Sequence, residues 1–208
     1  MNDIKAQFVA AAKSLFDRGY ATGAAGNMSV VMPDGLVLAT PTGSSMGNLD
    51  PERLSVLTMQ GALISGDKPT KEVAFHLAIY QNNPDLKAVV HLHSCYCTAL
   101  SCLKGLDPKN VLKPFTPYVV MRMGDIPLVP YYKPGSDMLA KELAALAPHH
   151  KAFLLANHGP VVCGSDLTQA LNNAEELEAT AKVYFTLGVH QERIAYLSEE
   201  QVDALKAK

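Results

Sequence analysis

The chain has 208 residues, of which 48% are hydrophobic and 18% charged, and its formal net charge at pH 7 is −2. This apolar content allows a sizeable core, and the charge content is too low for a disordered chain. The near-neutral charge argues against a nucleic-acid-binding protein, and no apolar run reaches the roughly 18 residues that a membrane span needs. We therefore expect one domain over residues 1–208, with neither nucleic acid nor membrane as a partner.

The N-terminal segment and the cysteines indicate a cellular compartment. Residues 1–5 show no basic start followed by an apolar block, so we expect no signal peptide. The four cysteines lie at positions 95, 97, 102 and 163. Because three of them are clustered, their spacing is poor for a disulfide framework. These features predict a reduced, cytoplasmic protein.

The first half of the chain predicts two helices and four strands. Apolar residues at helical spacing predict a helix over residues 3–18. Pro69 is placed to open a second helix as a first-turn proline, and that helix should end near Asn82. A Pro-Asp-Gly turn at 33–35 predicts a hairpin between the first two strands. The expected strands are 29–32, 36–39, 54–57 and 62–64.

The second half predicts five more strands and two more helices. The strands are expected at 88–93, 119–123, 127–130, 153–156 and 161–163. A short helix is expected over 94–102. Asp166 and Gln169 resemble a capping box at the start of a long helix with one apolar face. The irregular alternation predicts one mixed sheet with helices packed on both faces.

Histidine is frequent for a near-neutral chain, with seven residues. His91 and His93 fall on a predicted strand, where side chains two positions apart point to one face. His158 follows another strand, and the adjacent Gly159-Pro160 predicts a sharp turn that fixes its direction. Glu72 lies one turn into the helix predicted earlier in the chain. Three imidazole nitrogens and a carboxylate are typical of a catalytic metal site.

The ligand types favour Zn²⁺, one ion per chain, and leave Mn²⁺, Fe²⁺ or Co²⁺ open. The other four histidines, at positions 76, 149, 150 and 190, lack a comparable context. We interpret His76 as a packed core residue and His149-His150 as a solvated helix end.

Three loops rich in small and hydroxyl residues offer hydrogen-bond donors for an anion. They are Gly26-Asn27, Thr42-Gly43-Ser44-Ser45 and Thr70-Lys71. The last is expected at a helix N-terminus, where the dipole favours an anion, and Lys71 adds a positive charge. Together the loops predict a phosphate site, although no Walker-type or dinucleotide fingerprint is present.

At these same residues the sequence resembles the class II aldolase and adducin family. The matching segments occur in family order over about residues 3–188. They are Gly26-Asn27-Met28-Ser29, Thr40-Pro41-Thr42-Gly43, Pro69-Thr70-Lys71-Glu72, His91-Leu92-His93, Pro130-Tyr131 and Asn157-His158-Gly159. The resemblance implies an α/β fold with a mixed, mostly antiparallel sheet flanked by helices. It also implies a divalent metal and a cyclic homotetramer with active sites between subunits.

The resemblance also implies residue roles. His91, His93 and His158 match the metal ligands, and Glu72 matches an acid/base that in some members also touches the metal. The phosphate-binding positions of the family correspond to Asn27, Thr42, Gly43, Thr70 and Lys71. Tyr131 matches a tyrosine that reaches a neighbouring subunit's active site and helps to donate a proton. One departure is that sugar-phosphate aldolases usually carry two serines where this chain has Thr70-Lys71.

Within the family, four segments are similar to the members that decarboxylate 3-oxo-tetronate 4-phosphates. They are residues 40–44, 66–72, 116–122 and 128–131. This similarity implies loss of CO₂ from a β-keto acid to give dihydroxyacetone phosphate, through an enediolate that a divalent metal stabilises as a Lewis acid. Glu72 or Tyr131 would return the proton. Arg122, Lys133 and Lys71 are candidates for binding the substrate carboxylate.

Three alternatives stay open at this point. Retro-aldol cleavage passes through the same enediolate, so a sugar-phosphate aldolase fits the same residues. An epimerase or dehydratase of the same family is a further enzymatic alternative. A non-catalytic adducin-like module is the third, although such a module is expected to lose metal ligands that this chain retains.

Overall fold

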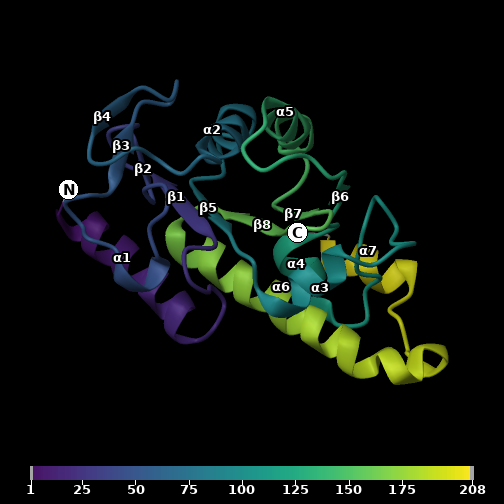
Figure 1. Cartoon of the computed structure of the whole chain (residues 1–208). Coiled ribbons are helices and arrows are strands. Elements are labelled where there is room, and N and C mark those ends of the chain that lie inside the picture. The colour runs from purple at the N-terminus through teal and green to yellow at the C-terminus, as the bar shows by residue number, and fades with distance from the viewer. Residues whose placement is uncertain (1, 207–208) are drawn as a thin grey trace.

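The computed structural model describes residues 2–206, and within them eight strands form one sheet in the order β4-β3-β2-β1-β5-β8-β7-β6 (Figure 1). The strands are β1 (Asn27–Val31), β2 (Val37–Ala39), β3 (Ser55–Leu57), β4 (Leu63–Ser65), β5 (Ala88–His91), β6 (Leu128–Val129), β7 (Ala152–Leu155) and β8 (Gly159–Gly164). Neighbouring strands are antiparallel except β6 and β7, which are parallel. The expected mixed, mostly antiparallel sheet is therefore confirmed.

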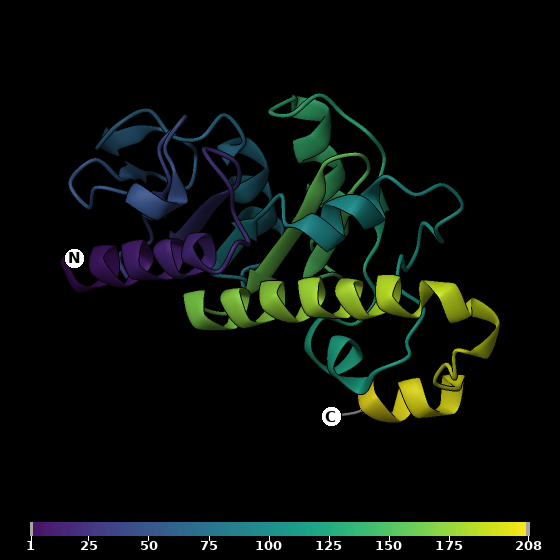
Figure 2. The same cartoon turned by 60° about the horizontal axis from the view of Figure 1, so that its bottom comes forward.

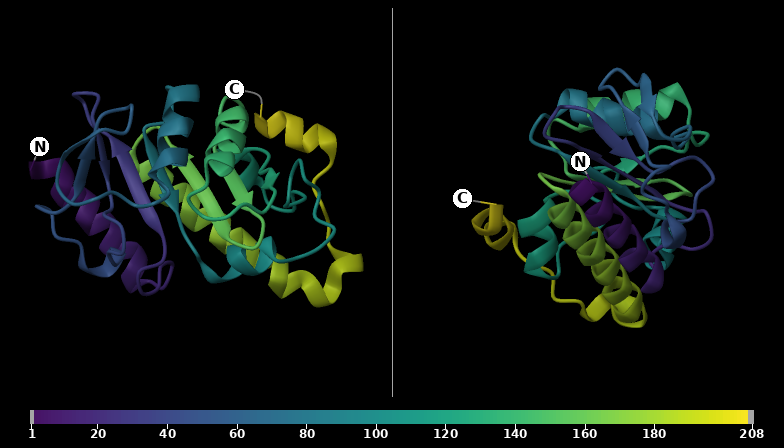
Figure 3. Two further views of the ribbon diagram at one scale, coloured as in Figure 1. Left: turned by 45° about the horizontal axis from the view of Figure 1, so that its top comes forward. Right: turned by 90° about the vertical axis from the view of Figure 1, so that its left-hand side faces the viewer.

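Helices cover both faces of this sheet. They are α1 (Asn2–Asp17), α2 (Val73–Asn82), α3 (Cys95–Ser101), α4 (Pro117–Met123), α5 (Asp137–Leu146), α6 (Leu167–Leu187) and α7 (Glu199–Lys206), with 3-10 turns at Met46–Asn48 and Gly188–Arg193. α2 and α5 lie on one face, and α1 and α6 lie on the other (Figures 1 and 3). No helix in residues 2–206 is both long and apolar enough to cross a bilayer.

Strand alternation divides the interior into two cores. On β1, Met28 and Val30 pack in the core between the sheet and the α1/α6 layer. Ser29, between them, points to the opposite face, where α2 and α5 enclose a second core that includes Phe75 and Phe153. Because both faces are covered, polar side chains of the central strands that point toward α2 are removed from water and need hydrogen-bond partners inside the protein.

The local signals at one hairpin turn and one helix cap are confirmed. β1 and β2 form the hairpin expected around residues 33–35, with Val31 opposite Val37. The Asp166 side chain accepts a hydrogen bond from the Gln169 amide at the start of α6, as the capping pattern predicts. The helices α5 and α7 were not expected from the sequence.

One predicted strand is wrong, because residues 119–123 lie in helix α4. A short run of β-branched and apolar residues fits either a buried strand or a buried helix. Pro117 in the first turn is the local signal that favours the helix, whereas the Thr116 hydroxyl at the N-cap position makes no capping hydrogen bond. α4 packs against α6 and α7 (Figure 2), so Arg122 lies on a helix and not on a strand.

The start of α2 also differs from the expectation. The helix begins at Val73 with Glu72 as its N-cap residue, so Glu72 precedes the first turn and does not lie one turn inside. Pro69 pairs with Pro41 in an isolated bridge and is not a first-turn proline. Proline suits an extended segment as well as a helix start, so its position alone did not decide between them. The bridge places the segment entering α2 beside the loop after β2.

Candidate active site

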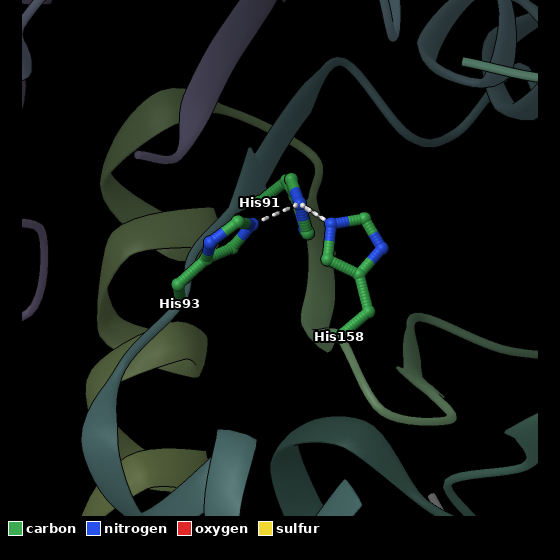
Figure 4. Close-up of side chains that lie close together, drawn as sticks. All are labelled: His91, His93 and His158. Carbon is green, nitrogen blue, oxygen red and sulfur yellow. Dashed lines mark hydrogen bonds between the residues drawn. The ribbon is translucent and has the colours of Figure 1, made fainter. Parts of the chain in front are cut away.

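Three histidines meet at the end of β5. His91 is the last residue of the strand, His93 follows it, and His158 lies in the turn between β7 and β8 (Figure 4). The His91 Nε2 atom lies 3.2 Å from His93 Nε2 and 3.3 Å from His158 Nε2. The structure therefore brings the three sequence-predicted histidines together, with their Nε2 atoms directed to one point.

The backbone around His158 is shaped to place this side chain. Asn157 has a φ of 56°, the one positive value outside glycine in the described residues. Such backbone strain concentrates at functional sites. Gly159 has a φ of 155°, and a Cβ there would lie 2.4 Å from the Leu92 carbonyl oxygen. A side chain is therefore excluded at position 159, where the turn packs against the backbone between His91 and His93.

The hydrogen bond of His91 defines which of its ring nitrogens carries the proton. Its Nδ1 donates to the Pro160 carbonyl oxygen at 2.9 Å, so Nε2 carries the lone pair that faces His93 and His158. Burial lowers the pKa of His91 well below its usual value, with further lowering from the two neighbouring imidazoles. Burial is also the largest cause of the lowered pKa of His93 and of His158. Neutral imidazoles with converging lone pairs are the form that binds a metal cation.

Glu72 completes a set of four donors. Its Oε2 lies 3.4 Å from His91 Nε2, and its Oε1 lies 3.6 Å from His158 Nε2. Ligands at 2.0–2.1 Å around a tetrahedral ion lie about 3.3–3.4 Å from one another. The observed separations of 3.2–3.6 Å match that geometry. Oε1 of Glu72 is buried, and no group in the described residues donates a hydrogen bond to it. These residues therefore fit a divalent metal ion.

A cleft of about 310 Å³ opens beside this cluster. It is lined by Glu72, His93 and His158 and by all the predicted phosphate-binding residues, which are Asn27, Thr42, Gly43, Thr70 and Lys71. The amide of Thr42 donates to the Lys68 carbonyl oxygen, and the amide of Thr70 donates to the Thr40 carbonyl oxygen. Those two backbone N–H groups are therefore already used within the protein.

Among the described residues, Lys71 is the one lysine or arginine that lines the cleft. Its positive charge is close enough to lower the pKa of His93 and of His158, after the larger effect of burial. An anionic substrate group would be attracted to this end of the cleft. Lys71 therefore supplies positive charge to a cleft that the Glu72 carboxylate also bounds.

Three other predicted site residues lie outside the lining of this cleft. Tyr131 follows β6 and is 62% exposed. Lys133 is adjacent to Pro134, which does line the cleft. Arg122 borders a separate hollow with Tyr20 and side chains of α6. Within one chain, the structure does not bring these residues to the histidines, and their roles stay predictions.

Sequence reasoning missed two groups of buried polar residues. His76 was interpreted as packed, but both of its ring nitrogens are hydrogen bonded within a polar network that ends at Glu72. Glu178 of α6 accepts from the Ser94 hydroxyl and from the amides of Tyr96 and Cys97 at the start of α3. It thereby fixes the segment that directly follows His93. Neither group forms a local motif.

The fold and the site together identify a family. A model described as the Class II Aldolase and Adducin N-terminal domain matches residues 6–185. The chain belongs to the class II aldolase and adducin family. A 3-oxo-tetronate 4-phosphate decarboxylase of Escherichia coli O6:H1 (strain CFT073) is 63% identical over 196 residues, which cover 94% of this chain and 92% of the relative. An L-fuculose phosphate aldolase of Methanococcus maripaludis (strain DSM 14266) is 40% identical, with 87% and 96% covered.

Solved structures of similar proteins have the same fold. YgbL from Escherichia coli, described as an aldolase/epimerase/decarboxylase, superimposes with a TM-score of 0.97 at 58% identity and covers 99% of both chains. An L-fuculose 1-phosphate aldolase superimposes with a TM-score of 0.88 at 28% identity, with 99% of this chain and 95% of that chain covered. The fold is thus shared by members whose names describe different reactions.

Proposed function

We propose that this protein is a metal-dependent carbon–carbon lyase that decarboxylates a 3-oxo-tetronate 4-phosphate. The observation that carries the proposal is the meeting of His91, His93, His158 and Glu72 beside a cleft that Lys71 also lines. The 63% identity to a decarboxylase of that name supports the choice of substrate.

The chemistry of the substrate sets what the site must do. A 3-oxo-tetronate carries a ketone β to its carboxylate. When the bond to the carboxylate breaks, CO₂ leaves and the electron pair passes toward the ketone oxygen, which gives an enediolate. Protonation of the carbon that lost CO₂ then gives dihydroxyacetone phosphate. The site must therefore stabilise negative charge at one oxygen and supply one proton.

His91, His93, His158 and Glu72 are the residues that would hold the divalent cation. We propose Zn²⁺, one ion per chain, because three imidazole nitrogens and one carboxylate are ligands that Zn²⁺ favours. When bound, the ion supplies Lewis-acid stabilisation of the charge that develops on the substrate ketone. The hydrogen bond from His91 Nδ1 to the Pro160 carbonyl oxygen keeps Nε2 available for this role.

Lys71 and its neighbours would bind the phosphate end of the substrate. Lys71 provides the charge, and the hydroxyls of Thr42 and Thr70 and the side-chain amide of Asn27 line the same cleft. Gly43, at a φ of 70°, has open space where a Cβ would lie, so the loop can approach a ligand closely. Binding energy at this remote end would orient the carboxylate bond that breaks.

Glu72 and Tyr131 are the proposed acid/base pair. The Oε1 atom of Glu72 is buried beside the cleft, and no group in the described residues donates a hydrogen bond to it, so we propose that the oxygen facing the metal site also exchanges the proton. Tyr131 is exposed and cannot act within its own cleft in this conformation, so we propose that it acts in the site of a neighbouring subunit of a homotetramer. We propose Arg122 and Lys133 as the residues that bind the substrate carboxylate. The compartment we propose is the cytoplasm.

The substrate proposal is tested by supplying the metal-loaded protein with 3-oxo-tetronate 4-phosphates of each stereochemistry and with ketose 1-phosphates. Dihydroxyacetone phosphate is measured by a coupled assay, and CO₂ and aldehyde release are measured in parallel. We expect equal amounts of CO₂ and dihydroxyacetone phosphate. Aldehyde release from a ketose 1-phosphate, with no turnover of any 3-oxo acid, would contradict the decarboxylase proposal.

A sugar-phosphate aldolase is the second candidate function. It is favoured by the L-fuculose phosphate aldolase relative at 40% identity and by the close superposition of an L-fuculose 1-phosphate aldolase. Lys71 argues against it, because the aldolase pattern carries a serine there. A non-catalytic module is disfavoured because all four proposed metal ligands are present and correctly spaced.

The intersubunit role of Tyr131 can be tested by mixing two inactive variants, His91→Ala and Tyr131→Phe. If the tyrosine acts in a neighbouring site, co-refolded hybrids contain some complete sites and regain part of the activity. Hybrids that stay inactive, or a Tyr131→Phe protein with wild-type turnover, would reject this role. Tyr118 on α4 is 58% exposed and provides the comparison. A loss of turnover in Tyr118→Phe alone would transfer the role to that helix.

A further inference from the structure

A line of buried side chains runs from Glu72 into the core beneath α2. The Asn27 Nδ2 atom donates to Glu72 Oε2 at 2.9 Å, and the His76 Nε2 atom lies 2.6 Å from Asn27 Oδ1. The His76 Nδ1 atom lies 2.8 Å from the Ser29 hydroxyl, which lies 2.6 Å from the Tyr80 hydroxyl. All five residues are buried, and four consecutive hydrogen bonds connect them.

The direction of each bond follows from the first one. Because Asn27 donates to Glu72 through its amide nitrogen, its oxygen faces His76 and must accept, so His76 carries its proton on Nε2. The Nδ1 atom of a neutral imidazole is then an acceptor, and Ser29 donates to it. The Ser29 hydroxyl has one hydrogen, so it accepts from Tyr80. Every donor thus points along the line toward the Glu72 carboxylate.

These side chains meet because strand β1 and helix α2 pack against each other. Asn27 and Ser29 alternate on the face of β1 that α2 covers, and Asn27 is paired with His91 in the neighbouring strand. His76 and Tyr80 are one helical turn apart on α2, so they face the same side of the strand. Only the first member of the line, Glu72, also faces the three histidines.

His76 makes no contact with His91, His93 or His158 through its ring nitrogens, since both are used by Asn27 and Ser29. Burial lowers its pKa to about 3, with a smaller lowering from the nearby His91, so it stays neutral at physiological pH. It stacks on Phe75, with ring centroids 4.6 Å apart. A neutral, fully bonded ring is suited to orienting a neighbour rather than to exchanging protons.

We propose that His76 is a positioning residue that holds the Glu72 carboxylate in its working orientation through Asn27. If the His76 donor were removed, the Asn27 amide could turn over and place its oxygen against the Glu72 carboxylate, which is repulsive. With the donor present, Glu72 Oε2 stays bonded to Asn27, and Oε1 is the oxygen left for the site chemistry. This inference rests on the proposed function for the role of Glu72, but not for the geometry of the line.

The kinetic test compares two substitutions of His76 in the metal-loaded enzyme. His76→Phe keeps the ring shape but removes the donor, and His76→Gln keeps an N–H near the position of Nε2. We expect His76→Phe to lower kcat about 10- to 100-fold with little change in KM, as for other residues that orient ligands. His76→Gln should regain part of that loss. Leu143→Ala, a buried residue of the same core outside the line, is the control for a purely structural loss of stability.

A folded His76→Phe protein with wild-type kcat would overturn the proposal. So would a rise in KM alone, because that indicates lost substrate binding instead of a misplaced Glu72. If Leu143→Ala lowers kcat as much as His76→Phe at equal loss of stability, the effect is structural and the proposal fails.

A second test does not depend on activity. In ¹⁵N-histidine-labelled, metal-free protein, long-range ¹H–¹⁵N spectra report which ring nitrogen of His76 is protonated. We expect a neutral ring protonated on Nε2 between pH 5 and 8, and loss of that fixed tautomer in Asn27→Ala. A ring protonated on Nδ1 would reverse the line and overturn the inference, even if the decarboxylase assay succeeds. If the protein does not decarboxylate any 3-oxo acid but His76 is protonated on Nε2, the proposed function is contradicted and the inference about the line of hydrogen bonds is not.

Discussion

His76 and His91 are both completely buried on the same side of the sheet, but their ring nitrogens have different partners. Both nitrogens of His76 face neutral protein groups that can complete a hydrogen bond. Only one nitrogen of His91 does so, and the other faces two more imidazole nitrogens and a carboxylate. A buried polar atom that its own chain does not satisfy needs a reason. The contrast separates a residue that supports the site from one that binds at it.

Glu72 belongs both to the metal-ligand cluster of His91 and to the buried line of hydrogen bonds that contains His76. One carboxylate oxygen accepts from Asn27 and so ends the line of hydrogen bonds that includes His76. The other is buried beside His158, and no residue between 2 and 206 donates a hydrogen bond to it. The two oxygens of this one carboxylate therefore have different roles. Substitutions in the metal-ligand cluster should change metal binding and catalysis strongly, whereas substitutions in the line of hydrogen bonds should have smaller effects.

The largest effect is expected from His91→Ala. Removing one of four donors should abolish tight metal binding and lower kcat/KM by about 10³-fold or more, because Lewis-acid stabilisation is worth several kcal/mol. Metal analysis of the purified protein, together with the coupled assay, measures both. His149→Ala, a substitution at an exposed histidine, is the control. A His91→Ala protein that keeps one metal per chain and full activity would contradict the role of His91 as a metal ligand.

Glu72→Gln is expected to have the next largest effect. Glutamine keeps the shape and can still accept from Asn27, but it cannot exchange a proton. General acid–base catalysis contributes about 10²- to 10⁴-fold, so kcat should fall by a factor in that range. Circular dichroism and metal content check that the fold and the site survive. Wild-type kcat in this variant would assign the proton to another group.

The separate motifs that form the histidine cluster were predictable, because their signals are short-range. Strand alternation predicted His91 and His93 on one face; the strand ends at His91, and His93 reaches the cluster from the segment that follows it. The Gly-Pro that follows His158 marks the turn. The hairpin and the cap of α6 were predictable for the same reason. Within each of these motifs the deciding residues lie a few positions apart. That His158 meets His91, 67 positions away, followed only from the resemblance to the family.

The supporting line was not predictable, because its partners are 45–51 positions apart in the chain. It depends on β1 and α2 packing together, which no local pattern of Ser29, His76 or Tyr80 encodes. The predicted strand over residues 119–123 was wrong for a different reason. The apolar run there fits both a strand and a helix, and contacts with α6 and α7 favour the helix.

The pH dependence of the stability of the metal-free protein should show that His76 is neutral in the folded state. The pKa of His76 is about 3 when folded and about 6.5 when unfolded. Between these values the unfolded chain binds more protons, so the free energy of unfolding falls as the pH is lowered from 6.5 toward 3, by up to ~1.4 kcal/mol per pH unit for this residue. His91, also lowered, adds a dependence of the same sign.

His76→Phe should therefore show a shallower slope than the wild type between about pH 6 and pH 4. Urea unfolding at several pH values, with a chelator present in every sample, measures the two slopes. Equal slopes would mean that His76 is protonated in the folded protein, and the ring could not then accept from Ser29.

The smallest effect is expected from Tyr80→Phe, at the far end of the line. The change removes one donor to Ser29, so it should cost about 1 kcal/mol of stability. Two further hydrogen bonds separate Ser29 from Asn27, and the bond from His76 to Asn27 is kept, so kcat should stay within about 3-fold of wild type. Tyr132→Phe removes a tyrosine hydrogen bond to Glu142 outside the line and is the matched control. A loss of kcat equal to that of His76→Phe would mean that the whole line acts as one unit, because orientation would then depend on the Tyr80 hydroxyl as much as on the imidazole that contacts Asn27.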